Sequence, residues 1–139
     1  MLEIKRFDND EVIHSGEFSS IKELVEDAIV IRKSLYRANL GGANLRGINL
    51  RGINLGGTNL KDANLRCCIG NGREVKSLQI GTYLISYTKE VLNIGCQSFS
   101  HEEWFNFTNE EIKSFDNNND ALEWWNLNKT ILKELVSRG

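Results

Sequence analysis

Basic side chains that could bind phosphate are concentrated in the middle of this sequence. Eight Lys or Arg residues fall between positions 32 and 73, where Asp62 is the only acidic residue. A guanidinium group offers a planar fork of donors that matches phosphate oxygens, and an ammonium group acts on them as a point charge. The candidate ligand-binding residues of this segment are Arg37, Arg46, Arg51, Lys61, Arg66 and Arg73.

The distribution of charge supports this choice. Residues 1–31 hold three basic against eight acidic residues, a net charge of −5, and residues 74–139 hold six against ten, a net charge of −4. The middle segment has a net charge of +7, so the overall value of −2 conceals a basic centre between acidic flanks. The basic face either binds an anion or is solvated and balanced by the chain's own flanks or by a neighbouring protomer.

A catalytic constellation has much less support. Cys96 and His101 are five residues apart, and Asp116 could complete a set of nucleophile, base and acid. No glycine-rich elbow precedes Cys96, and a cysteine in a β-segment usually belongs to the core, so we expect Cys96 there. The sequence contains no P-loop, no dinucleotide fingerprint and no metal-ligand spacing. We therefore expect neither an enzyme nor a cofactor nor a bound metal.

A five-residue repeat organises the basic segment. Asn-Leu recurs six times at this period, from Asn39-Leu40 to Asn64-Leu65, with a small or aliphatic residue before each Asn. A period of five fits neither the helical period of 3.6 nor the strand period of 2. It requires a chain that turns a corner every five residues, with Leu along the axis. Asn suits these corners because its side chain bonds the backbone of its own turn.

These pentads resemble the pentapeptide-repeat family over roughly residues 35–68. The resemblance implies a right-handed, four-sided β-helix with four pentads per coil. Ile48 and Ile53 depart from it, because the family prefers Ala, Cys or Ser at that position. The register ends where Gly70 replaces the next Leu, so the coil should have about one and a half turns. The order of elements along the chain resembles small pentapeptide-repeat proteins of phages and prophages, which implies a viral accessory protein.

The flanks should close both ends of this coil. We expect a hairpin at residues 2–7 and 11–15, then a helix from Ser20 to Ile29 that caps the coil. A meander of three strands at 75–80, 83–88 and 91–94 should follow, with helices after the capping boxes Ser100/Glu103 and Thr108/Glu111 and a last helix from about 120 to 136. We predict a single domain, mainly β with α: hairpin and helix over 1–34, coil over 35–70, meander and helical tail over 71–139.

In a coil of four pentads, residues twenty apart stack about 4.8 Å from each other. Arg46 should therefore lie under Arg66, an unfavourable pairing unless an anion or a carboxylate lies between them. The outward glycines either allow a ligand to approach closely or simply suit the corners. They are Gly41, Gly42, Gly47, Gly52, Gly56 and Gly57.

Aromatic residues provide a second possible contact with a ligand. Trp124 and Trp125 are adjacent, so both cannot point into one narrow helical stripe. We expect one of them to be partly exposed and include Trp124 among the ligand-binding candidates. A wide core face that holds both indoles is the alternative.

Two functions follow as hypotheses. The first is a non-catalytic phage protein that sequesters an anionic, nucleotide-like signal of host defence. The second is a module that binds and inhibits a host defence or replication protein. A DNA mimic that inhibits topoisomerase, as in some members of the family, is disfavoured because this coil is short and basic. Specific nucleic-acid binding is not expected either.

Compartment and assembly can also be predicted. No apolar run approaches the ~20 residues of a membrane span, and no signal-peptide pattern precedes the hairpin. Clustered cysteines, including Cys67 and Cys68, favour a reducing compartment. We therefore expect a cytoplasmic protein, in the host cytoplasm if a phage encodes it. The C-terminal end of the coil is covered either by the tail or by a second copy; this opening and the charge complementarity between flanks and centre favour a homo-oligomer.

Overall fold

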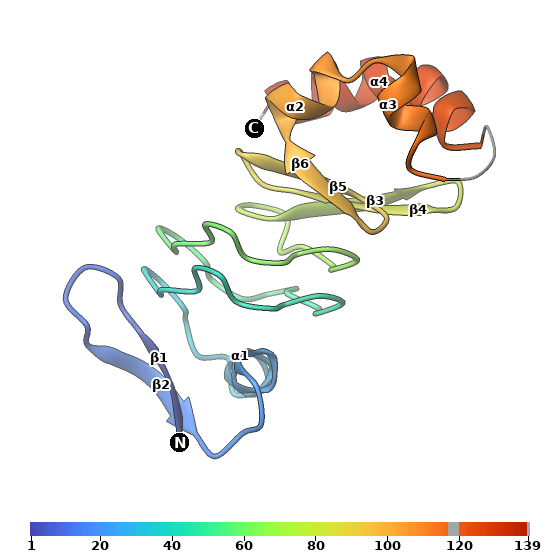
Figure 1. Cartoon of the computed structure of the whole chain (residues 1–139). Coiled ribbons are helices and arrows are strands. Elements are labelled where there is room, and N and C mark those ends of the chain that lie inside the picture. The colour runs from blue at the N-terminus through green and yellow to red at the C-terminus, as the bar shows by residue number, and fades with distance from the viewer. Residues whose placement is uncertain (117–119, 139) are drawn as a thin grey trace.

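A computed structural model describes residues 1–116 and 120–138. The chain begins with strands β1 (Leu2–Lys5) and β2 (Val12–Gly16), followed by helix α1 (Ile21–Val30). A coil without assigned strands comes next, then a four-stranded sheet and three helices. Figure 1 shows these parts stacked in chain order, with the hairpin and α1 at one end and the C-terminal helices at the other.

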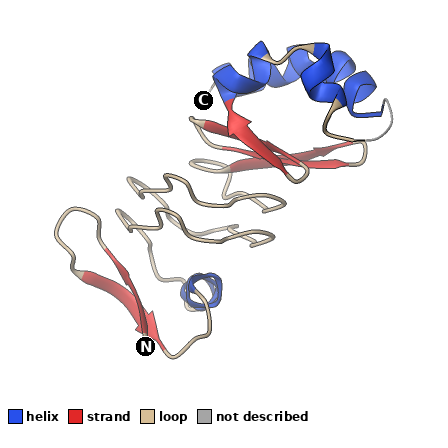
Figure 2. Ribbon diagram, in the orientation of Figure 1, coloured by secondary structure: helices blue, strands red, loops and turns tan. Residues whose placement is uncertain are grey.

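Isolated parallel bridges hold the coil together at a spacing of twenty residues. They join Asn39 to Asn59, Asn44 to Asn64 and Asn49 to Ile69. Hydrogen bonds flank each bridge; the amide of Leu45, next to Asn44, for example, donates to the Asn64 carbonyl at 2.9 Å. Four pentads therefore complete one turn. The assigned strands all pair antiparallel, in the hairpin and in the later sheet, and the coil is drawn as loop in Figure 2.

Leucine fills the axis of the coil as the repeat predicts. The buried axial leucines are Leu35, Leu40, Leu45, Leu50, Leu55 and Leu65. Ile48 and Ile53 are also buried, so the coil accommodates these larger residues in its small-residue row. Together with Val75 and the inner face of α1, these side chains form the first hydrophobic core.

The corners of the coil depend on two backbone features that recur with the pentad. In all six pentads the Asn side-chain oxygen accepts the amide two residues later, at 2.8–3.3 Å. Every fifth residue from Arg32 to Gly72 has a positive φ. Five of these nine residues are glycine, and the conformation favours glycine because it lacks a Cβ. Corner geometry therefore accounts for Gly42, Gly47, Gly52 and Gly57 without a ligand.

The N-terminal elements cover the first turn of the coil. Leu24, Val25 and Ala28 of α1 are fully buried against it, as the expected capping helix requires. The hairpin lies beside the coil, where the Asn39 amide donates to the Lys5 carbonyl at 2.7 Å. This pairing occupies an edge that would otherwise be free to pair with another chain.

The coil ends at Gly70, where the chain turns sharply back. A Cβ at this position would lie 2.1 Å from the Val75 carbonyl oxygen, so only glycine fits. The sheet that follows has the order β3 (Lys76–Ile80), β4 (Tyr83–Tyr87), β5 (Val91–Ile94) and β6 (Gln97–Ser100). The sheet has four strands where a meander of three was expected, because β6 was not predicted.

The three C-terminal helices cover one face of this sheet (Figure 2). They are α2 (His101–Asn106), α3 (Asn109–Lys113) and α4 (Asp120–Ser137), and both predicted capping boxes are present at Ser100 and Thr108. The second hydrophobic core lies between these helices and the sheet and includes Ile85, Leu92, Trp104, Trp125 and Leu132. The described residues form both helices and strands, so the architecture is mixed α and β.

The opposite face of the sheet closes the C-terminal end of the coil through polar groups. Ser86 Oγ donates to the Leu65 carbonyl at 2.6 Å and accepts from Asn93 Nδ2 at 2.9 Å. Both side chains are buried, so a hydrogen-bonded layer separates the two cores. Of the two alternatives for this end of the coil, the tail or a second copy, the structure shows the tail, whose sheet covers it. A homo-oligomer stays a prediction that rests on charge complementarity alone.

Candidate functional site

The structure distributes the predicted basic residues around the sides of the coil. Each position that follows Asn by two residues projects from a corner and stacks on the position twenty residues away. Arg46 stacks with Arg66, Lys61 with Gly41, and Arg51 with Asn71. The six basic candidates therefore do not form one site. They form one stacked pair, one groove and two separate positions.

Arg46 and Arg66 form the stacked pair. The Gly47 amide, next to Arg46, donates to the Arg66 carbonyl at 3.0 Å, so these side chains leave adjacent rungs of the same corner. Neither makes an ion pair with any residue that the structure describes. The Arg66 Nε is buried and has no hydrogen-bond partner among the described residues. A buried donor without a partner requires an explanation such as a water molecule or an ion.

Lys22 of α1 extends this pair toward the N-terminal end. Its Nζ lies 3.8 Å from the position that a Cβ on Gly47 would occupy. At the C-terminal end of the pair, the residue after Arg66 approaches the sheet: the Sγ of Cys67 lies 4.0 Å from the carbonyl oxygen of Gly95 in the turn between β5 and β6. We call Lys22, Arg46 and Arg66 the basic column. Sequence reasoning missed Lys22, because nothing in the repeat indicates which face of α1 lies beside the coil.

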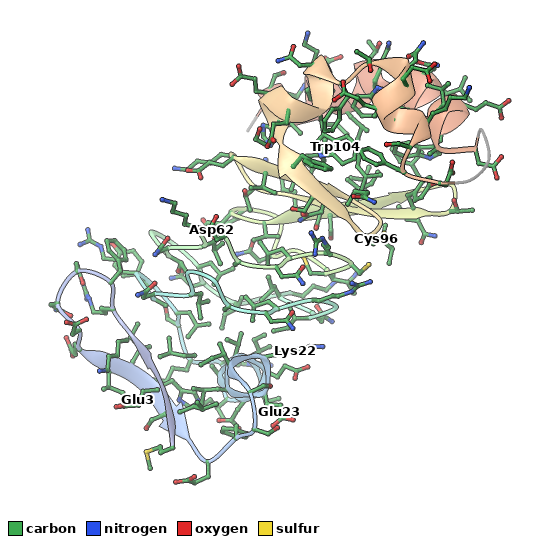
Figure 3. The ribbon with its side chains drawn as sticks, viewed as in Figure 1. Glu3, Lys22, Glu23, Asp62, Cys96 and Trp104 are labelled. Atoms are coloured by element: carbon green, nitrogen blue, oxygen red, sulfur yellow. The ribbon has the colours of Figure 1, made fainter. Side chains whose placement is uncertain are left out.

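Lys61 and Arg73 line a different feature, a groove of about 730 Å³ between the coil and the β4–β5 turn. Two further cations, Lys76 and Lys89, line it as well. Its carboxylates are Asp62, Glu74 and Glu90. The groove is therefore of mixed charge. In Figure 3, Asp62 lies on the opposite side of the molecule from Lys22 and Cys96, so the groove is separate from the basic column.

Arg37 is held by an internal ion pair. Its Nη1 lies 3.0 Å from Oδ2 of Asp8, and Arg6 Nη2 lies 2.7 Å from the same oxygen. Hydrogen bonds from Arg6 and Arg37 hold the pKa of Asp8 well below its usual range. The hairpin brings Asp8 to the coil from 29 residues away, which the local sequence does not indicate. Arg37 is thus already engaged, whereas Arg51 is exposed on its own corner.

Trp124 packs against the second core and does not belong to the basic column. Its indole Nε1 donates to the Ile80 carbonyl at 3.0 Å, and its ring meets Tyr83 edge-on at 5.0 Å. Trp125 is buried and Trp124 is half-buried, as the adjacency of the two indoles predicted. The structure does not bring Trp124 together with the basic residues of the coil.

The candidate catalytic set is not assembled. Cys96 is exposed in the turn between β5 and β6, so its prediction as a core residue was wrong. His101 follows the other end of β6, where its Nε2 donates to the Thr88 carbonyl at 2.9 Å. Strand β6 separates the two side chains. Its four residues span about 13 Å at the usual rise per residue.

Among residues 1–116 and 120–138, no group of three or more His, Cys, Asp or Glu side chains could hold a metal ion. No helix in the described part of the chain combines the length and apolar character that crossing a membrane requires. The three cysteines are free.

Comparison with known proteins identifies the coil. Neither the curated proteins nor the solved structures gave a match to the chain. A family profile described as pentapeptide repeats matches residues 34–69 in eight copies, which is the segment that carries the parallel bridges at a spacing of twenty residues and the two arginines of the basic column. This segment, about a quarter of the chain, therefore consists of pentapeptide repeats.

Proposed function

We propose that this chain is a non-catalytic binding protein that holds a compact, phosphate-bearing anion at the basic column. The coil would be a right-handed, four-sided β-helix that sets the spacing of the arginines. The biological setting that we propose is phage counter-defence, with sequestration of a nucleotide-like signal in the host cytoplasm. The observation that carries the proposal is the buried Nε of Arg66, which has no hydrogen-bond partner among the described residues, beside Arg46, which forms no ion pair with any of them.

The electrostatic argument follows from the spacing of the rungs. Two guanidinium groups that leave neighbouring rungs about 4.8 Å apart repel each other unless a negative group lies between them. The described residues supply no carboxylate there, whereas Arg37 has Asp8. A phosphate oxygen would satisfy the Arg66 Nε and reduce the repulsion at the same time. Lys22 would add a third positive charge to a ligand that extends along the column.

Titration calorimetry with inorganic pyrophosphate tests the proposal. We expect wild-type protein to bind it, and Arg66→Gln and Arg46→Gln to weaken binding at least tenfold. The matched control is Arg51→Gln, which removes the same charge from a neighbouring corner and should leave the Kd within about twofold. An absence of binding to the wild type, or an equal loss in all three variants, would refute a specific site at the column.

A second function, binding and inhibition of a host protein, is favoured by the groove. Its volume of about 730 Å³ and its alternation of four cations with three carboxylates suit a charged peptide segment better than a phosphate. Capture of proteins from host lysate by wild type and by a Lys61→Glu/Arg73→Glu variant tests this function. A partner that is lost in the groove variant and kept by Arg66→Gln would support it. Native mass spectrometry of protein from infected cells would show whether a phosphate-bearing molecule is bound instead.

A further inference from the structure

A small aromatic cavity lies between the sheet and the C-terminal helices. It measures about 80 Å³ and is lined by the chain's three tryptophans, Trp104, Trp124 and Trp125, together with Tyr83 and Phe115. Figure 3 shows Trp104 between the sheet and the helices that cover it. The cavity is about half the size of an engineered ~150 Å³ cavity that binds benzene. It can therefore take a compact group of only a few heavy atoms.

The polar groups of two of these indoles are already used. Trp104 Nε1 donates to the Leu92 carbonyl at 2.6 Å, and Trp124 Nε1 donates to the Ile80 carbonyl at 3.0 Å. These bonds fix the rings and leave neither N–H group for an anion. The rings of Tyr83 and Trp124 stand at 77° to each other with centroids 5.0 Å apart. The cavity is walled by aromatic rings, whose faces attract cations.

A carboxylate adds negative potential beside these rings. Asp116 follows Phe115, and its Oδ2 accepts the amide of Ala121, another residue of the cavity wall, at 3.0 Å. Its Oδ1 is buried and has no hydrogen-bond partner among the described residues. The pKa of Tyr83 is raised, chiefly by burial and then by the negative charges of Asp116 and Asp120. The surroundings of the cavity therefore favour a positive group over a negative one.

We propose that this cavity binds a small methylated ammonium group. The methyl groups would fill the apolar volume, the aromatic faces would stabilise the positive charge, and Asp116 would supply the counter-charge. A free quaternary amine and a methylated lysine side chain share this chemistry. The site is distinct from the basic column, which attracts the opposite charge.

Choline and 3,3-dimethylbutan-1-ol, its uncharged carbon analogue, form the matched pair of probes. Because all three tryptophans line the cavity, the intrinsic fluorescence of the full chain reports on this site. We expect choline to bind at least tenfold more tightly than the alcohol. A peptide with trimethyllysine is the second arm. Tighter binding of the peptide than of choline assigns the site to a methylated side chain, and the reverse assigns it to a free amine.

Variants separate this proposal from simple filling of a void. Asp116→Asn should weaken choline at least fivefold and leave the alcohol unchanged, whereas Arg51→Gln should change neither. Trp124→Leu, checked for folding by circular dichroism, should weaken all of the probes. Equal affinity of wild-type protein for choline and the alcohol would overturn the proposal, as would the absence of any response to choline and the peptide. Failure of pyrophosphate to bind the column would leave it intact.

Discussion

Ser86 joins the sheet to the coil, and removal of its hydroxyl should destabilise the whole chain. The hydroxyl donates to the Leu65 carbonyl at 2.6 Å and accepts from Asn93 Nδ2 at 2.9 Å, and neither side chain is more than 3% exposed. In Ser86→Ala, the Asn93 amide loses this partner where water has little access, whereas the Leu65 carbonyl still accepts the Cys68 amide at 3.3 Å. An unpaired buried group costs ~1–3 kcal/mol, so we expect the free energy of unfolding to fall by about 1–3 kcal/mol.

A double-mutant cycle makes the reasoning sharper. Asn93→Ala leaves the bond from Ser86 to Leu65 in place and should cost about 1–2 kcal/mol. In the double variant the orphaned amide is gone. The double variant should therefore lose less stability than the two single variants lose together, and the difference should be about 1 kcal/mol or more. Urea denaturation followed by tryptophan fluorescence and far-UV circular dichroism measures all three losses.

Ser15→Ala provides the matched control, because Ser15 is exposed in β2 and should change stability by less than ~0.5 kcal/mol. A similarly small loss in Ser86→Ala would show that the hydroxyl does not hold the two cores together. A cycle that is additive within error would show that Ser86 and Asn93 act independently. Either result would refute the hydrogen-bonded layer as the connection between coil and sheet.

Two further predictions concern thiols and pH. A thiol reagent should label exposed Cys96 first, half-buried Cys67 more slowly, and Cys68 only on unfolding, because burial hides the Cys68 thiol and raises its pKa. Mass spectrometry of the labelled peptides gives the order of labelling. Equal rates for the three cysteines would contradict the fold where the coil meets the sheet. The pKa of Asp8 is lower in the folded chain than in the unfolded one, so its stabilising effect is complete above the usual carboxyl pKa of 3.8 and is lost as the pH falls below it. The protection factors of the Phe7 and Asn39 amides, measured by hydrogen exchange against the intrinsic rate at each pH, should accordingly fall in Asp8→Asn at neutral pH and in wild type on acidification, with Asp10→Asn as the unaffected control.

The coil could be predicted because its determinants are local and repeated. The Asn side chain bonds the amide two residues later, and Leu must point to the axis, so each pentad specifies the same corner. The capping boxes at Ser100 and Thr108 are equally local, and both formed as predicted. Such features need only a few neighbouring residues.

Features that depend on distant contacts were missed or misplaced. Strand β6 reads Gln-Ser-Phe-Ser and has a single apolar residue, so it becomes a strand through its pairing with β5 and not through its own pattern. The exposure of Cys96 follows from that same pairing, which makes residues 95–96 a turn. Arg37 was grouped with free cations because its partner Asp8 belongs to the hairpin. These outcomes were fixed by contacts between segments that no local pattern connects.

The basic column also shows how far the repeat alone narrows the choice of site. Four corners carry the outward residues, and the stacking distance of twenty residues pairs each with one other. Those pairs are Tyr36 with Gly56, Gly41 with Lys61, Arg46 with Arg66, and Arg51 with Asn71. The third pair alone consists of two cations. A net charge of +7 spread over the segment does not itself select a binding site, but two like charges on one corner impose a local electrostatic cost. A bound anion at that corner would offset the cost, which is why we place the proposed ligand there rather than along the whole basic segment.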